Sequence, residues 1–297
     1  MRTWRWSRQS KCCQYLIPLL LLLSCSPALR AMASCPPSPF IRRSPLVIAH
    51  ASSTYFGPSN TIEMMRAAVQ AGADVVDADV RISADGVLVA AHDDDLAANT
   101  KATGSLHTRT LKQLKQLDAA WTWRGPKRNH PLRGSGVTIP TVEEILNAFP
   151  NRRVSLEFKT TGGEQAMCTL LRRLGRTKDV YLGSAGDAAI DTFKPLCPEV
   201  TTTVTDAMVV DMQQAQSNGA PYCSPATIGQ PPFSIAGRRI VTPASVAWDH
   251  QHGMAVYTWT LDDPTTLAEA ARSAVDGVYT GRADVARATF DEVKAQV

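Results

Sequence analysis

The feature that most constrains the fold is the regular alternation of short apolar runs with amphipathic, helix-like stretches. Such alternation within one domain favours a (β/α)8 barrel, the single-domain TIM barrel of the α/β class. An open doubly wound sheet is the alternative, but no glycine-rich phosphate loop follows the first strand. Strands are expected at residues 45–50, 73–80, 87–92, 153–159, 180–183, 200–204, 255–260 and 277–280, and helices at 61–71, 110–117, 141–149, 163–174 and 264–272.

The first 33 residues read as an export signal rather than as part of the fold. A basic start precedes the apolar run 15–23, and Ala31-Met32-Ala33 has the small-x-small pattern of a cleavage site. The run is too short for a spanning helix, which needs about 20 apolar residues. A second interpretation is a lipoprotein signal ending in a lipidated Cys25, which would anchor the chain by lipid without a stable membrane span. We therefore expect a secreted, periplasmic or cell-envelope protein.

The remaining chain divides into a tether, a domain and a tail. Residues 34–45 contain four prolines and predict a Pro-rich tether, residues 46–290 the barrel, and residues 291–297 a C-terminal tail. Removing 33 of 297 residues leaves 264, a length that suits one undivided α/β barrel.

Charge excludes one class of partner. Residues 1–33 carry five of the 31 Lys and Arg and none of the 27 acidic residues, so the remaining chain has 26 basic and 27 acidic side chains. A formal charge of −1 gives no electrostatic basis for nucleic-acid binding.

Four cysteines remain after the signal: Cys35, Cys168, Cys197 and Cys223. In an exported chain they allow two disulfides in three pairings, and one bridge with two buried thiols is an equally good interpretation.

Polar residues of chemical interest lie where the apolar runs end. His50 ends the first run, Asp77 and Asp79 lie near the end of the second, and His92 ends the third. Glu157 and Lys159 close a later run, again two residues apart and so on one face of a strand. In a barrel the carboxyl ends of the strands form the active-site face. These side chains are therefore expected to converge there.

Such a cluster favours a cation and phosphate-ester chemistry. Three carboxylates repel one another unless a cation lies among them, and oxygen ligands suit Mg²⁺ or Ca²⁺. A hard cation and Lys159 would bind charged phosphate oxygens, while one imidazole accepts a proton and the other gives one. Taken singly, each of these residues has an ordinary structural interpretation, such as a loop cap or an ion pair at the rim. Their shared position at strand ends favours the functional one.

At these residues the chain resembles the glycerophosphodiester phosphodiesterase family. His50, Pro58, Asn60 and Thr61 match the family's opening motif of His-Arg-Gly and, after a fixed spacer, Pro-Glu-Asn-Thr. Further family motifs correspond to residues 72–80, 85–93, 114–118, 156–159, 258–260 and 275–280. The resemblance covers about residues 47–284 in several ordered motifs.

The resemblance implies a barrel that uses a divalent cation to hydrolyse a glycerophosphodiester to glycerol 3-phosphate and an alcohol. By position, it assigns His50 and His92 as the acid–base pair and Lys159 as a phosphate contact. It further implies metal ligands at Asp77, Asp79 and Glu157, and supporting or pocket residues at Asn60, Asp93 and Trp259. The partner is thus a small-molecule phosphodiester.

Four departures from the family pattern favour a second hypothesis, a catalytically impaired barrel that binds phosphodiesters or an envelope partner. Ala51 stands at a family Arg, Ser59 at the Glu of Pro-Glu-Asn-Thr, Ala98 at an Arg, and Gly281 at an Asp. Because both histidines and all three carboxylates are retained, we expect the enzyme.

Overall fold

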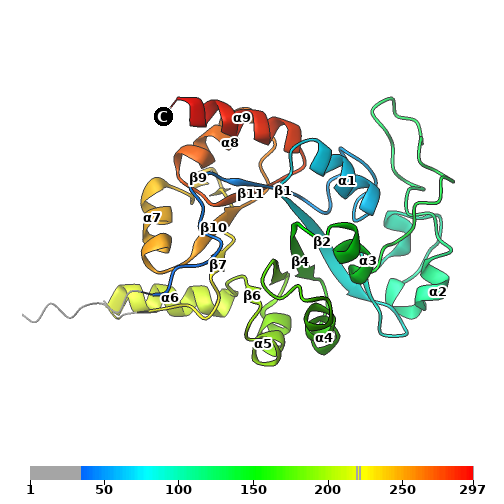
Figure 1. The fold of residues 1–297 in the computed structure, drawn as a ribbon, viewed down its shortest axis with the longest axis horizontal. Coiled ribbons are helices and arrows are strands. Elements are labelled where there is room, and N and C mark those ends of the chain that lie inside the picture. The colour runs from blue at the N-terminus through cyan, green and yellow to red at the C-terminus, as the bar shows by residue number, and fades with distance from the viewer. Residues whose placement is uncertain (1–34, 219, 221, 297) are drawn as a thin grey trace, which may run out of the picture. The chain divides into compact units, whose positions relative to one another are not determined.

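Eight parallel strands form the central barrel of the computed structural model, which describes residues 35–218, 220 and 222–296 (Figure 1). Their order around the sheet is β6-β5-β4-β2-β1-β11-β10-β7. A parallel bridge between Thr203 and Ile228 joins the two ends of this order. The strands are β1 (Leu46–Ala49), β2 (Val75–Ile82), β4 (Arg153–Phe158), β5 (Val180–Ser184), β6 (Thr201–Thr202), β7 (Ile228–Gly229), β10 (Ala255–Thr258) and β11 (Gly277–Thr280).

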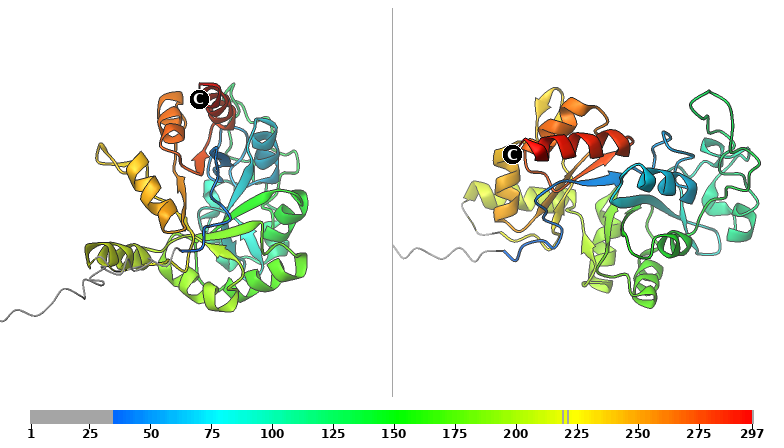
Figure 2. Two further views of the ribbon diagram at one scale, coloured as in Figure 1. Left: turned by 60° about the vertical axis from the view of Figure 1, so that its left-hand side comes forward. Right: turned by 45° about the horizontal axis from the view of Figure 1, so that its top comes forward.

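Helices follow most barrel strands and cover the outside of the sheet (Figures 1 and 2). They are α1 (Ile62–Gln70), α3 (Val142–Ala148), α4 (Glu164–Leu174), α5 (Asp187–Leu196), α6 (Asp206–Asn218), α7 (Pro243–Gln251), α8 (Pro264–Arg272) and α9 (Ala283–Ala295). Several begin at side-chain caps that the sequence provides: Thr61, Thr141, Thr242 and Asp263 each accept a hydrogen bond from the first turn. The predicted TIM barrel is therefore confirmed.

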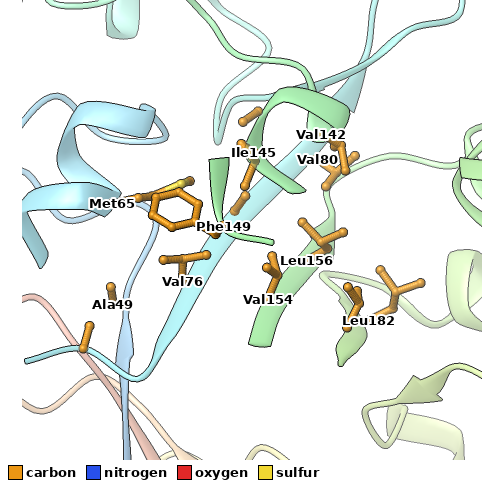
Figure 3. Close-up of a cluster of buried hydrophobic side chains, with 14 of the residues drawn as sticks. Ala49, Met65, Val76, Val80, Val142, Ile145, Phe149, Val154, Leu156 and Leu182 are labelled. Atoms are coloured by element: carbon orange, nitrogen blue, oxygen red, sulfur yellow. The ribbon is translucent and has the colours of Figure 1, made fainter. Parts of the chain in front are cut away.

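Alternation along each strand separates two apolar layers. Outward-facing residues such as Val76, Val80 and Leu156 pack against the helices in the larger core (Figure 3). Residues of the opposite parity, among them Ile48, Val75 and Tyr181, fill the barrel interior. The period of two in the sequence thus decides which side chains point into the barrel.

The apolar run 87–92 is not a barrel strand. It forms β3 (Leu88–Ala90), which pairs antiparallel with the end of β2 through a turn at residues 84–86. Because β3 runs back along β2, Ala91 returns to the barrel rim, where its N–H donates to the Asp79 carbonyl at 2.9 Å. Strand β7, which the sequence did not predict, supplies the eighth position.

An insertion between β3 and α3 has a small core of its own. It includes α2 (Leu111–Leu114) and two short 3₁₀ helices, η1 (Leu96–Ala98) and η2 (Leu106–Thr108). Leu96, Leu106 and Leu114 are buried within it. The other remaining strands, β8 (Ser234–Ile235) and β9 (Arg238–Arg239), form a hairpin after β7.

The expected tether is attached to the domain instead. Phe40 is fully buried in the interior core, edge-on to Tyr181 with ring centroids 5.5 Å apart, and the Ser38 N–H donates to the Gly253 carbonyl. A large aromatic ring stabilises the segment because it removes apolar surface from water. At the other end, α9 extends past residue 290 to Ala295, into the expected tail.

The four cysteines form two disulfides, Cys35 with Cys223 and Cys168 with Cys197, so the two-disulfide alternative is the one that the structure contains. The signal region with Cys25 lies outside the described residues. Within the described part of the chain, none of the helices has the length and apolar character needed to cross a membrane.

Candidate active site

Strand β2 turns two aspartates into the barrel. Val76 and Val80 belong to the layer beneath the helices, whereas Val75 belongs to the interior core. Asp77 and Asp79 share the parity of Val75 and therefore face the interior, where each is only 3% exposed. Two carboxylates on one face of one strand are held close together in a site that excludes most water.

Strand β4 places a lysine between acidic partners. The Lys159 Nζ lies 3.1 Å from Asp79 Oδ1 and 2.8 Å from Glu157 Oε1. Burial alone would lower the pKa of Lys159, but the two carboxylates outweigh it and raise the pKa above its ordinary value. The three predicted metal ligands do not have oxygens all within 4.8 Å of one another among the described residues. In this arrangement Lys159 provides the positive charge that Asp79 and Glu157 need.

Asn60 links the start of α1 to Asp79. Its Nδ2 donates to Asp79 Oδ2 at 2.7 Å, and its Oδ1 accepts from the Asp79 N–H at 2.9 Å. Asn60 adopts φ 57°, a left-handed conformation that asparagine tolerates better than most residues. Ser52 adds a third contact, because its hydroxyl donates to the same Oδ2 at 2.9 Å. Asp79 is therefore held in one orientation from two sides.

The His50 ring lies at the end of β1, the strand next to β2. Its backbone N–H donates to the Thr280 carbonyl at 3.0 Å, which fixes it to the end of β11. Burial lowers the pKa of His50, and the negative charge of Asp79 offsets only part of that effect. The imidazole is consequently held in its uncharged form near neutral pH and can accept a proton.

The predicted partner His92 lies one residue beyond Ala91, which binds the Asp79 backbone. Its side chain is 47% exposed, and its Nδ1 lies 3.1 Å from Asp93 Oδ1. Arg81 donates from Nε and Nη2 to the His92 carbonyl at 2.9 and 2.7 Å. The backbone of His92 is therefore fixed at the rim beside Asp79, while its ring lies on the open side.

The environment of Asp77 disfavours the charged form of its carboxyl group. Burial, followed by the nearby charge of Asp79, raises the pKa of Asp77 to about 8, although the Ala51 N–H donates to it at 3.0 Å. Two buried carboxylates this close do not both ionise without a compensating cation. Asp77, Asp79 and Glu157 offer only oxygen donors, the chemistry that a hard divalent cation prefers, although in this arrangement their oxygens are not gathered around one point.

A polar stack inside the barrel reaches Asp77 through Ser155, whose hydrogen bond lowers the pKa of Asp77 against the larger effect of burial, and this stack was not predicted. Ser155 Oγ and Tyr181 OH each lie 3.0 Å from the Tyr279 OH, and Gln230 also donates to that hydroxyl. Ser155 was detectable in the sequence, because it precedes Glu157 by two residues and so shares its face. Tyr279 and Gln230 gave no such signal.

Trp259 lies at the end of β10, away from the direct contacts of the acid cluster. The residue is 47% exposed, and its Nε1 donates to the Gln230 carbonyl at 2.8 Å. The structure thus places Trp259 at the rim, whereas Asp79, Lys159, Glu157 and Asn60 are joined by direct contacts.

The departures from the family pattern have distinct structural settings. Ser59 and Ala98 line one small cavity beside Asn60, and Ser59 contacts Asn99 through its hydroxyl. They are therefore neighbours in space. Ala51 is fully buried, and its backbone N–H is the group that binds Asp77.

At Gly281 a carboxylate is supplied from elsewhere. Asp262, in the loop between β10 and α8, accepts hydrogen bonds from the Gly281 N–H at 2.7 Å and from the Thr280 hydroxyl at 2.9 Å. A Cβ at position 281 would lie 2.7 Å from Ser53 Oγ and 3.4 Å from Asp262 Oδ2. The negative charge of Asp262 acts on His50 and raises its pKa, against the larger effect of burial. Asp262 is a candidate site residue that the sequence pattern did not predict.

A closed parallel barrel with acids, a lysine and His50 at the carboxyl ends of its strands, and with His92 following β3 at the same rim, has the architecture of a TIM-barrel enzyme. Residues 50–285 match the model of the glycerophosphoryl diester phosphodiesterase family. The chain therefore belongs to this family of hydrolases, which generally use a divalent metal ion.

Individual relatives agree with this assignment. The Mycobacterium tuberculosis protein named "Probable glycerophosphodiester phosphodiesterase 2" is 27% identical over 249 residues, covering 82% of this chain and 89% of the relative. The fold is similar to the glycerophosphoryl diester phosphodiesterase domain of another M. tuberculosis protein, with TM-score 0.69, 22% identity, and coverage of 84% and 99%. It is also similar to an Oleispira antarctica phosphodiesterase solved with its product sn-glycerol-3-phosphate, with TM-score 0.65, 23% identity, and coverage of 84% and 97%.

Proposed function

We propose that this protein is an exported, metal-dependent hydrolase that cleaves glycerophosphodiesters to glycerol 3-phosphate and an alcohol. The observation that carries the proposal is the contact between Asp79 and Lys159 at the barrel rim, with Asp77 beside them and the His50 and His92 backbones on either side. The groups that we propose to bind phosphate, hold the cation and transfer protons lie at one end of the barrel, which supports the proposal.

Water supplies the oxygen that replaces the alcohol in this reaction. A bond forms between the water oxygen and phosphorus, the bond from phosphorus to the alcohol oxygen breaks, and one proton reaches the departing alcohol. His50 is uncharged in the resting protein, which suits the group that accepts a proton, and His92 on the open side would donate one to the leaving oxygen. Lys159 would hold a non-bridging phosphate oxygen once its carboxylate partners are neutralised.

Asp77, Asp79 and Glu157 would hold the cation, with Mg²⁺ or Ca²⁺ as the candidates for an oxygen-only set. When bound, the cation supplies positive charge that stabilises the phosphate oxygens in the transition state. Asn60 and Ser52 keep Asp79 in one orientation, and the Ala51 N–H does the same for Asp77.

An exported location is supported by the two disulfides together with the signal-like first 33 residues. Disulfides persist mainly in oxidising compartments. We therefore place the protein outside the cytoplasm, in the periplasm, the cell envelope or the medium.

The test is an assay of the purified protein against a panel of glycerophosphodiesters, with Mg²⁺ or Ca²⁺ added after chelator treatment and glycerol 3-phosphate measured as product. We expect cation-dependent release of glycerol 3-phosphate from at least one member. Cation binding without turnover on any member would instead support the impaired barrel, which the family arginine missing at Ala51 favours.

A further inference from the structure

Positive charge is concentrated in one segment of the insertion between β3 and α3. Residues 101–133, which we call the basic arm, contain eight Lys and Arg and a single acid, Asp118. The rest of the chain after residue 33 is left with 18 basic and 26 acidic residues. The near-neutral total charge is therefore the sum of a formal charge of +7 on the arm and −8 on the rest of the chain after residue 33.

The charges of the arm are available to a partner. Lys115 pairs with Glu144, but the other seven have no carboxylate partner among the residues that the structure describes. All seven are exposed: Lys101, Arg109, Lys112, Arg124, Lys127, Arg128 and Arg133. An excess of like charge in one segment lowers stability through self-repulsion. An anionic partner would provide the compensating charge.

The arm lies beside the mouth of the candidate active site. The Trp123 Nε1 donates at 2.8 Å to the carbonyl of Thr54, four residues after His50. The Thr122 hydroxyl donates at 2.8 Å to the Ala98 carbonyl, near the cavity that Ser59 lines. Figure 1 shows α2 and the loop that follows it outside the ring of barrel strands.

Aromatic rings accompany these charges. Arg133 and Lys101 lie 4.3 and 5.1 Å from the centre of the Trp121 ring. Tyr55, next to the Thr54 that binds the arm, is 52% exposed. Rings with a polar edge settle at the level of lipid headgroups, where one part is apolar and the other is wet.

We propose that the basic arm docks this protein onto a bilayer surface that contains anionic phospholipid, with Tyr55 entering the headgroup layer. Basic groups near such a surface are attracted by its negative potential. An exposed aromatic ring beside them can bury apolar surface in a bilayer, whereas a soluble polyanion offers no such apolar contact. Because Thr54 joins the arm to the loop after His50, docking would hold the mouth of the barrel close to the membrane. This inference concerns binding and does not depend on hydrolysis.

Vesicle co-sedimentation at 0.1 M salt tests the proposal, with phosphatidylcholine vesicles compared with vesicles that contain one third phosphatidylglycerol. The protein is used from residue 34 onward, which removes the basic and apolar start; the barrel, its core and both disulfides lie within the described residues after it. We expect binding to the anionic vesicles alone, and its loss at 0.5 M salt because exposed charges are screened.

A pair of matched variants locates the binding surface. Arg124→Gln with Lys127→Gln should weaken binding about thirtyfold, since each basic group contributes about 1 kcal/mol near an anionic leaflet and 1.36 kcal/mol is tenfold. The control, Arg43→Gln with Lys178→Gln, removes two exposed charges that precede β1 and β5, at the opposite barrel end, and should leave binding within twofold. Tyr55→Ser should weaken binding severalfold without changing the charge.

Three results would overturn the proposal. One is equal binding to both kinds of vesicle, and another is equal loss in the arm variant and the control. The third is binding to soluble polyphosphate as tight as to vesicles with no effect of Tyr55→Ser, which would identify a site for polyanions instead of a membrane surface.

Discussion

Replacing Lys159 by Met should destabilise the metal-free protein and yet increase the stabilisation that a cation provides. Its ammonium contacts Asp79 and Glu157, and its side chain is 12% exposed. Removing one partner of a buried ion pair costs about 3–5 kcal/mol, and the 34% exposure of Glu157 favours the lower end. In a domain of this size 1 kcal/mol shifts the melting temperature by roughly 2–4 °C, so a loss of about 6–12 °C is expected.

The gain on adding cation follows from competition at the same oxygens. In the natural protein a cation must take Asp79 and Glu157 away from Lys159, whereas in Lys159→Met the two carboxylates are left with each other and bind the cation more tightly. Turnover should still fall by roughly ten- to 150-fold, because a hydrogen bond to a charged group contributes about 1.5–3 kcal/mol.

The assay is a thermal melt of chelator-treated protein with and without saturating Mg²⁺ or Ca²⁺. Lys194→Met is the control, since Lys194 is half-buried but donates to the Val200 carbonyl instead of a carboxylate. Its cation-induced shift should equal that of the natural protein. If Lys159→Met shows a shift no larger than the natural protein does, Lys159 and the cation do not compete for these oxygens, and the proposed site is wrong.

Three further outcomes can be measured independently. Asp262→Asn removes a charge that raises the pKa of His50, so this pKa should fall and the acidic limb of the kcat/KM profile should move to lower pH; an unmoved limb would exclude this coupling. Because the pKa of Asp77 is about 8 in the metal-free protein, cation affinity should fall about tenfold per pH unit below 8, and calorimetry in two buffers should detect about one proton released near pH 6.5. Ser59 and Ala98 line one cavity, so Ser59→Glu and Ala98→Arg would place opposite charges side by side. The free energy of unfolding of the double variant should exceed the value expected from adding the two single effects by about 0.5–3 kcal/mol. Strictly additive effects would show that the new charges do not meet.

The inward direction of the acids could be predicted from the sequence, because side chains along a strand alternate between its two faces. Asp77 and Asp79 alternate with Val76, Ala78 and Val80, and the period of two survives any change in the surroundings. The presence of a barrel followed from the number of such alternations. The pairing of β3 did not, because an apolar run shows that a strand is buried and leaves its partner and direction open.

Features that depend on a single long-range contact, and not on a repeating pattern, could not be predicted from the sequence. Strand β7 has two residues and is followed by Gln230, Pro231 and Pro232, so no periodicity marks it. Phe40 is one aromatic residue among prolines, and a lone ring gives no pattern that distinguishes a buried segment from a tether. Asp262 precedes the cap of α8 and reads as an ordinary turn residue. Its contact with Gly281 spans 19 positions.

Phosphorus NMR of one glycerophosphodiester, incubated in parallel with the natural protein, His50→Ala and His92→Ala, tests whether these two histidines carry the proton transfers. All three samples contain the same saturating cation, and cation-binding melts confirm that each variant is folded. Removing a proton-transfer group costs typically about 10²–10⁴ in rate. We therefore expect a glycerol 3-phosphate signal that grows with the natural protein and grows at least about a hundredfold more slowly with both variants. Equal growth in the natural protein and in His92→Ala would contradict the placement of the chemistry on this pair of histidines.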